Sequence, residues 1–188
     1  MNTQVRALIV VACLAATPTF ASLVGTTVNG QLYFDGLTPN YFDPANGGVP
    51  AGYLNTAGPT VIISSTEPTF GYRDSANTDV ANFQSGTQLV ISDSVTETGD
   101  NAPIELIFTD TAFGSLSVVS DTFGYGGWSG SLVGDVITLN WAGGEVTDGQ
   151  SFTAVYNVGT VAVPDGGSTL ALLGMAMTSL ALLRRKLA

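Results

Sequence analysis

The oxygen-bearing side chains in residues 73–79 are the strongest candidates for binding a metal ion. Residues 73–79 read Arg-Asp-Ser-Ala-Asn-Thr-Asp. The carboxylate and amide oxygens of Asp74, Asn77 and Asp79 are the donors that a hard cation such as Ca²⁺ prefers. Their spacing differs from that of an EF-hand loop, and Asp and Asn also start turns by bonding their own backbone. The sequence thus offers a calcium site at these three residues, with a simple turn as the alternative.

Other residues offer a second set of candidates. A further turn-rich segment places Asp43 and Asn46 close together, and they rank behind the first group as calcium ligands. Two carboxylates could also hydrolyse a glycosidic bond, but no pattern singles out an acid/base pair among the 15 acidic residues. Tyr125 and Trp128, in a Gly-rich stretch, are candidates for stacking on a sugar, whereas Trp141 falls in an alternating segment and is expected in the core.

Several function classes are excluded by composition. The chain has no histidine, and its single cysteine, Cys13, lies near the N-terminus, so His-based triads and His/Cys zinc sites are excluded. No phosphate-binding loop is present. The net charge is −10, and Arg73 is the only cation between Ser22 and Val163, which argues against nucleic acid as a partner. We therefore expect a non-enzymatic protein with no obligatory cofactor.

The elements that must position these residues are short strands. Four segments alternate apolar and polar residues, as strands with one buried face do. Their alternating positions are Val28, Gly30, Leu32 and Phe34; Ile104, Leu106 and Phe108; Ile137, Leu139 and Trp141; and Phe152, Ala154, Tyr156 and Val158. Compact apolar runs at 61–63, 89–91 and 116–119 add further strands. The pattern predicts an all-β domain over residues 22–162, an antiparallel β-sandwich or jelly roll.

Two turns support antiparallel pairing. Gly134-Asp135 separates two apolar segments, which suits a two-residue hairpin with Gly at its first central position. Asp148-Gly149 precedes the segment that starts near Phe152 and suits the other type of tight hairpin. Two successive hairpins predict an antiparallel meander in this part of the chain.

The N-terminus has the organisation of a secretory signal peptide. Arg6 supplies a positive charge, residues 7–16 are apolar, and Thr19-Phe20-Ala21 has the small residues of a cleavage site. We predict a signal peptide over residues 1–21, cleaved after Ala21, with an uncleaved anchor as the alternative.

The C-terminus has three consecutive parts, which are a turn-forming motif, an apolar helix and a basic end. The helix is predicted over residues 168–183 and has no polar face, unlike a helix that packs on a soluble domain. Arg184, Arg185 and Lys186 follow at once in the tail 184–188, and such cations hold that end on the cytoplasmic side. We expect a single transmembrane helix, and a buried C-terminal helix is the alternative.

The motif before the helix is Val163-Pro164-Asp165-Gly166-Gly167. With the helix and the basic cluster it resembles the PEP-CTERM sorting signals, and in particular the VPDSG-CTERM branch, from which Gly166 departs. The resemblance implies processing by an exosortase-type enzyme in a Gram-negative bacterium with an exopolysaccharide matrix. It implies an inner-membrane intermediate and then a place on the cell surface or in the matrix. Gram-positive sortase signals have the same layout, and a sortase-anchored wall protein is the rival interpretation.

The leading hypothesis is a non-enzymatic, exported surface or matrix protein, delivered by its C-terminal signal. The alternative is an extracellular module that binds carbohydrate, such as exopolysaccharide, or calcium. The two hypotheses concern different parts of the chain, and a β-sandwich alone does not decide between them.

Overall fold

The strands form where the alternation of side chains predicts them. The structure, a computed structural model, describes residues 21–36 and 38–161. The sorting motif, the predicted transmembrane helix, the basic tail and all of the predicted signal peptide except Ala21 lie outside the described residues. Contacts within this part of the chain define one unit, Ala21–Val161. No helix among the described residues is long and apolar enough to cross a membrane.

Two five-stranded sheets make up most of this unit, and every strand pairing is antiparallel. The first has the strand order β2 (Thr60–Ile62), β1 (Thr27–Phe34), β7 (Ile104–Thr109), β10 (Val136–Trp141), β9 (Ser129–Val133). The second has the order β3 (Phe70–Arg73), β4 (Asn77–Gln84), β5 (Gln88–Val95), β12 (Ser151–Thr160), β8 (Phe113–Asp121). A two-stranded ribbon pairs β6 (Gly99–Asn101) with β11 (Gly144–Val146), and one 3₁₀ turn, η1, spans Leu54–Ala57.

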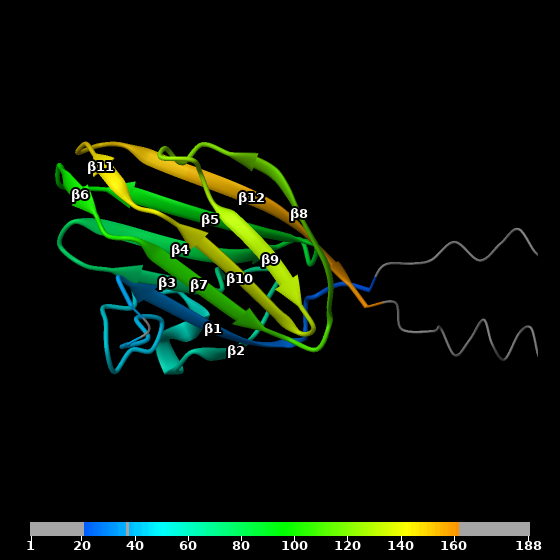
Figure 1. The fold of residues 1–188 in the computed structure, drawn as a ribbon. Coiled ribbons are helices and arrows are strands. Elements are labelled where there is room, and N and C mark those ends of the chain that lie inside the picture. The colour runs from blue at the N-terminus through cyan, green and yellow to red at the C-terminus, as the bar shows by residue number, and fades with distance from the viewer. Residues whose placement is uncertain (1–20, 37, 162–188) are drawn as a thin grey trace, which may run out of the picture. The chain divides into compact units, whose positions relative to one another are not determined.

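The core lies between the two large sheets, which face one another (Figure 1). Phe108 of β7 is fully buried, and its ring centroid lies 5.7 Å from that of Phe70 and 5.4 Å from that of Phe83 in the other sheet. Phe42, from the connection after β1, stacks on Phe70 at 5.0 Å. The all-β, antiparallel prediction is therefore confirmed for the described residues, and aromatic rings join the layers.

One of the two predicted hairpins forms, and the other does not. Val133 of β9 pairs with Val136 of β10 across Gly134-Asp135, where Gly134 takes φ 58° as a two-residue hairpin requires. Residues 147–150 form a turn, closed by the Gln150 amide donating to the Thr147 carbonyl at 3.0 Å. However, β11 pairs with β6, and β12 lies between β5 and β8. The predicted meander is wrong because the chain changes sheets after this turn.

Two segments differ in detail from the sequence-based expectation. The turn expected within residues 73–79 is limited to residues 74–76, because Arg73 ends β3 and Asn77 begins β4. Segment 116–119 is a strand, as predicted, and it belongs to β8 at the edge of its sheet. Its apolar side chains are not all buried, because Val118 is 62% and Val119 is 54% exposed. Irregular pairing with β12 shifts the register of β8 along the same stretch.

The long connection between β1 and β2 is held by two asparagines. The Asn40 side-chain oxygen accepts from the amides of Leu32 and Phe42, both at 3.0 Å. Asn55 is fully buried and donates to the Phe42 carbonyl at 2.9 Å. It also exchanges two hydrogen bonds with the backbone of Gly71 in β3, both at 3.1 Å. Side chains thus satisfy backbone groups that no strand partner reaches.

The chain enters and leaves the unit at the same end. Figure 1 shows the start and the end of the coloured ribbon side by side, and the Thr160 hydroxyl donates to the Ala21 carbonyl at 2.8 Å. The β4–β5 hairpin lies there too, since the Leu23 amide donates to the Gly86 carbonyl at 2.8 Å. The turn between β3 and β4 and the β6–β11 ribbon lie at the opposite end (Figure 1).

Candidate functional site

Two carboxylates face one another inside the sandwich at the end away from the chain's entry and exit. Asp79 of β4 and Asp93 of β5 are directly opposite in the strand register. Both occupy inward positions of their strands, and they expose only 7% and 1% of their surface. Burial of a charged group is costly unless it is paired, and two like charges side by side add to that cost. The pair is therefore electrostatically unfavourable unless a proton or a cation neutralises it.

Amide side chains surround this pair. The Asn77 amide nitrogen donates to the Asn101 side-chain oxygen at 3.0 Å, and the Asn101 nitrogen donates to Asp93 Oδ2 at 3.3 Å. Three buried oxygens that belong to this group have no hydrogen-bond partner in the protein: Asn77 Oδ1, Asp79 Oδ2 and Asp93 Oδ1. Buried polar atoms are nearly always paired, so three unpaired acceptors in one place indicate a missing positive group or donor.

The structure brings together only part of the predicted calcium set. Asn77 and Asp79 belong to the buried group, but Asp74 is exposed on the β3–β4 turn. There Asp74 Oδ1 accepts from the amides of Ala76 and Asn77, at 2.8 and 2.7 Å, as turn-forming Asp residues do.

The second predicted pair has turn contacts as well. Asp43 Oδ1 accepts from the Ala45 amide at 2.9 Å, and Asn46 donates to the Asn40 carbonyl at 3.1 Å. Among the described residues, no three or more His, Cys, Asp or Glu side chains form a group that could hold a metal ion. A cation site among the described residues would therefore need oxygen donors other than a third carboxylate.

Sequence reasoning missed Asp93 and Asn101. Asp93 follows Leu89 and Ile91 on the inward face of β5, and Val95 continues that face. A charged residue in phase with an apolar alternation is a signal of a buried charge, and it was present in the sequence. Asn101 carried no such signal, because its place depends on the pairing of β6 with the distant β11.

The protonation of the pair follows from its burial. Burial raises the pKa of Asp79 well above its usual value, and the charges of Asp93 and Asp74 raise it further. Burial, followed by the charge of Asp74, raises the pKa of Asp93 to about 6. The pair therefore holds protons more tightly than free carboxylates do when no cation is supplied.

We expect the metal-free protein to lose stability as the pH rises from 4.5 to 7. Both folded-state pKa values lie above the ordinary Asp value of about 3.9, so the native state binds more protons than the unfolded state in this interval. The free energy of unfolding should fall by on the order of 2 kcal/mol. Urea unfolding in EDTA, with the Asp79→Asn/Asp93→Asn double variant as reference, measures the difference. A difference that is constant with pH would contradict the assignment.

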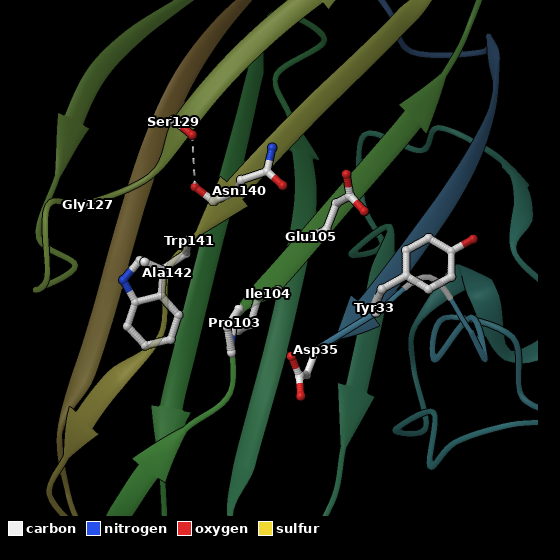
Figure 2. Close-up of a pocket in the computed structure, with 11 residues that line it drawn as sticks. Tyr33, Asp35, Pro103, Ile104, Glu105, Gly127, Ser129, Asn140, Trp141 and Ala142 are labelled. Carbon is white, nitrogen blue, oxygen red and sulfur yellow. Dashed lines mark hydrogen bonds between the residues drawn. The ribbon is translucent and has the colours of Figure 1, made fainter.

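A shallow hollow lies on the outer face of the first sheet (Figure 2). Its volume is about 410 Å³. Tyr33 of β1 pairs with Glu105 of β7, which pairs with Asn140 of β10, so the three form one row across the sheet. The Ser129 hydroxyl donates to the Asn140 carbonyl at 3.3 Å at the end of this row. The hollow is open, its lining mixes polar and apolar surface, and none of its lining side chains has a buried nitrogen or oxygen atom without a partner.

The Gly-rich segment after β8 does not present a pair of aromatic rings. Tyr125 is 57% exposed, as expected, but Trp128 is only 8% exposed and packs against Phe123 with ring centroids 5.4 Å apart. The Asp121 carboxylate accepts from the amides of Phe123 and Trp128, at 2.8 and 2.6 Å, and so turns the segment inward. Trp128 is therefore too buried to stack on a sugar, which corrects its selection as a candidate, while Trp141 is in the core as predicted.

Likeness to known proteins is found in the segment that follows the described unit. The family model of the VPDSG-CTERM motif matches residues 162–187. This match confirms the predicted resemblance, and it spans the motif at 163–167, the segment 168–183 for which a helix was predicted, and the basic cluster. The VPDSG-CTERM motif suggests an exported surface protein that an exosortase-type enzyme sorts. Comparisons of the chain with curated proteins and with solved structures gave no match.

Proposed function

We propose that this chain is a non-enzymatic surface or extracellular-matrix protein that an exosortase-type enzyme delivers through its C-terminal signal. The VPDSG-CTERM match at residues 162–187 carries the proposal. The signal follows the folded unit at once, because β12 ends at Thr160. Pro164 fixes its own φ and lacks an amide donor, and Gly166 and Gly167 add freedom, so this stretch suits an enzyme that must bind an extended chain.

The fold supports delivery of an intact domain. Ala21 and Thr160 are hydrogen-bonded neighbours, so the unit is complete before the signal begins and its opposite end is free of chain termini. The most prominent carboxylate pair, Asp79 and Asp93, is buried between the sheets and out of reach of a polymeric substrate. This burial supports a binding or structural role for the pair over glycoside hydrolysis.

Substitution of the motif tests the proposal. In the native host, the Pro164→Ala/Asp165→Ala variant of the full chain should accumulate in the membrane fraction as a precursor that retains residues 168–188. Cell fractionation followed by mass spectrometry of the intact protein measures this, because the mature form should end near the motif. Val161→Ala, an exposed change just before the matched segment, is the control and should be processed normally. Normal processing of the double variant would count against the sorting role.

A further inference from the structure

We propose that Asp79, Asp93 and Asn77 bind a divalent cation, with calcium preferred over magnesium. The site lies between β4, β5 and β6, at the end of the sandwich away from Ala21 and Val161. It is a property of the folded domain and does not depend on how the C-terminal signal is processed.

The first argument is the charge of the pair. Two carboxylates opposite each other, exposed by 7% and 1%, have no cationic side chain to neutralise them. Arg73 is the only Lys or Arg between Ala21 and Val161, and it is exposed. Because Tyr72 points inward beside Asp79, the alternation of β3 places Arg73 on the other face of the sheet. A bound cation would supply the charge that the protein itself lacks.

The second argument is the set of free oxygens. Asp79 Oδ2, Asp93 Oδ1 and Asn77 Oδ1 are buried and have no hydrogen-bond partner in the protein. The remaining contacts hold the ligands in place, since Asn101 bridges the Asn77 amide and Asp93 Oδ2. Two of the three free acceptors, on Asn77 and Asp93, therefore belong to side chains that Asn101 holds in place, as ligating groups are commonly held, and Asp79 is confined by its burial.

The chemistry of the donors favours calcium. Ca²⁺ takes six to eight oxygens from carboxylates, amides and water in irregular arrangements, whereas Mg²⁺ requires near-octahedral geometry and keeps most of its water. Two carboxylates and one amide oxygen leave the other positions to water molecules bound with the ion. Such a small protein contribution fits the weaker class of sites, with dissociation constants of about 10⁻⁴ to 10⁻³ M, that serve extracellular modules.

A shared proton is the competing explanation, because burial raises the pKa of both carboxyl groups. A proton on one carboxyl group would relieve the repulsion in the pair. Such a proton would leave the Asn77 oxygen without a partner unless the O–H group pointed toward that oxygen. The shared-proton explanation also predicts no response to metal ions. The two explanations therefore differ in a direct binding experiment.

The experiment uses the full chain in mild detergent, stripped of metal with EDTA and held at pH 7.5. A concentration of Ca²⁺ about 100 times its dissociation constant should raise the midpoint of thermal unfolding by about 5 °C or more, with Mg²⁺ giving less. Tb³⁺, a luminescent substitute for calcium, should be sensitised by Tyr72, which pairs with Asp79 across β3 and β4. Added Ca²⁺ should quench that emission by displacement.

Matched variants locate the ion. Asp93→Asn and Asp79→Asn should each lower calcium affinity about tenfold or more, because affinity depends on the charge of the ligands. Both variants remove a repelling charge from the buried pair, so we expect them to fold in EDTA. Asp110→Asn is the control: Asp110 is also buried, but it bonds Thr26 and the Ala112 amide, and its variant should bind calcium as before.

Three outcomes would overturn the proposal. The first is a wild-type protein whose unfolding midpoint and Tb³⁺ emission do not respond to calcium, which would assign the pair to a shared proton. The second is unchanged affinity in Asp79→Asn and Asp93→Asn, which would place the ion elsewhere. Equal stabilisation by magnesium and calcium would overturn the stated preference.

Discussion

Replacing Phe108 with Ala should lower the free energy of unfolding by about 3–5 kcal/mol, the usual cost of removing a large buried ring. Phe108 is fully buried on β7 and lies within 5.7 Å, centroid to centroid, of Phe70 and Phe83 in the opposite sheet. Its loss leaves a cavity where the sheets touch, and relaxation of two sheets cannot fill it completely. Since a domain is stable by only about 5–15 kcal/mol, this single change should remove a large share of its stability.

Urea unfolding followed by tryptophan fluorescence measures this loss. Val133→Ala is the control, because Val133 is 75% exposed on β9 and its truncation should change stability by no more than about 0.5 kcal/mol. Phe108→Leu should cost less than Phe108→Ala because it refills part of the space. A loss below about 1 kcal/mol for Phe108→Ala would mean that the sheets do not pack through this ring.

The class of the fold could be predicted from side-chain alternation because a strand with one buried face imposes a period of two. β1, β7, β10 and β12 show that period with few interruptions, and each was placed correctly. β4 was hidden because its inward positions begin with Asn77 and Asp79 before Ala81 and Phe83, so its first half has the composition of a turn. Polar residues at buried positions break the pattern at the place where the candidate site lies.

Pairing between distant strands could not be predicted from local sequence. β11 is three residues long and pairs with β6, more than 40 positions earlier in the chain, although a turn and the next strand follow it directly. Turn residues determine how the chain reverses direction, but they do not determine which sheet the next strand joins. Asn101 reaches the candidate site through this distant pairing, whereas Asp93 faces Asp79 across the neighbouring β4–β5 hairpin. Only two of the predicted calcium ligands, Asn77 and Asp79, belong to the site, because they lie on one short segment.

The arrangement of the domain relates its two candidate activities. The Thr160 hydroxyl bonds Ala21, so the chain leaves the sandwich where it enters, and the VPDSG-CTERM match begins two residues after β12. Asp79 and Asp93 lie at the other end of β4 and β5. The carboxylate pair and the start of the matched segment therefore lie toward opposite ends of the sandwich. Sorting and cation binding are separated along the length of one sandwich and can be tested by independent variants.

Replacing Asn55 with Ala should lower the free energy of unfolding by about 3 kcal/mol, because three buried hydrogen bonds are lost at roughly 1 kcal/mol each. Asn55 donates to the carbonyls of Phe42 and Gly71 and accepts from the Gly71 amide. These bonds fix the long β1–β2 connection onto β3 and thereby hold Phe42 against Phe70 in the core.

The Asn55 side chain is fully buried, so the backbone groups that it leaves behind lose their bonds where water is excluded, and the cost should exceed that of an exposed asparagine. Asn29→Ala is the matched control, since the Asn29 amide makes one exposed bond, to Thr60 at 2.8 Å. Hydrogen exchange should also accelerate at the Gly71 amide in the Asn55 variant and not in the control. Equal stability of the two variants would show that the connection is held by apolar packing alone, and that its polar contacts contribute nothing net to folding.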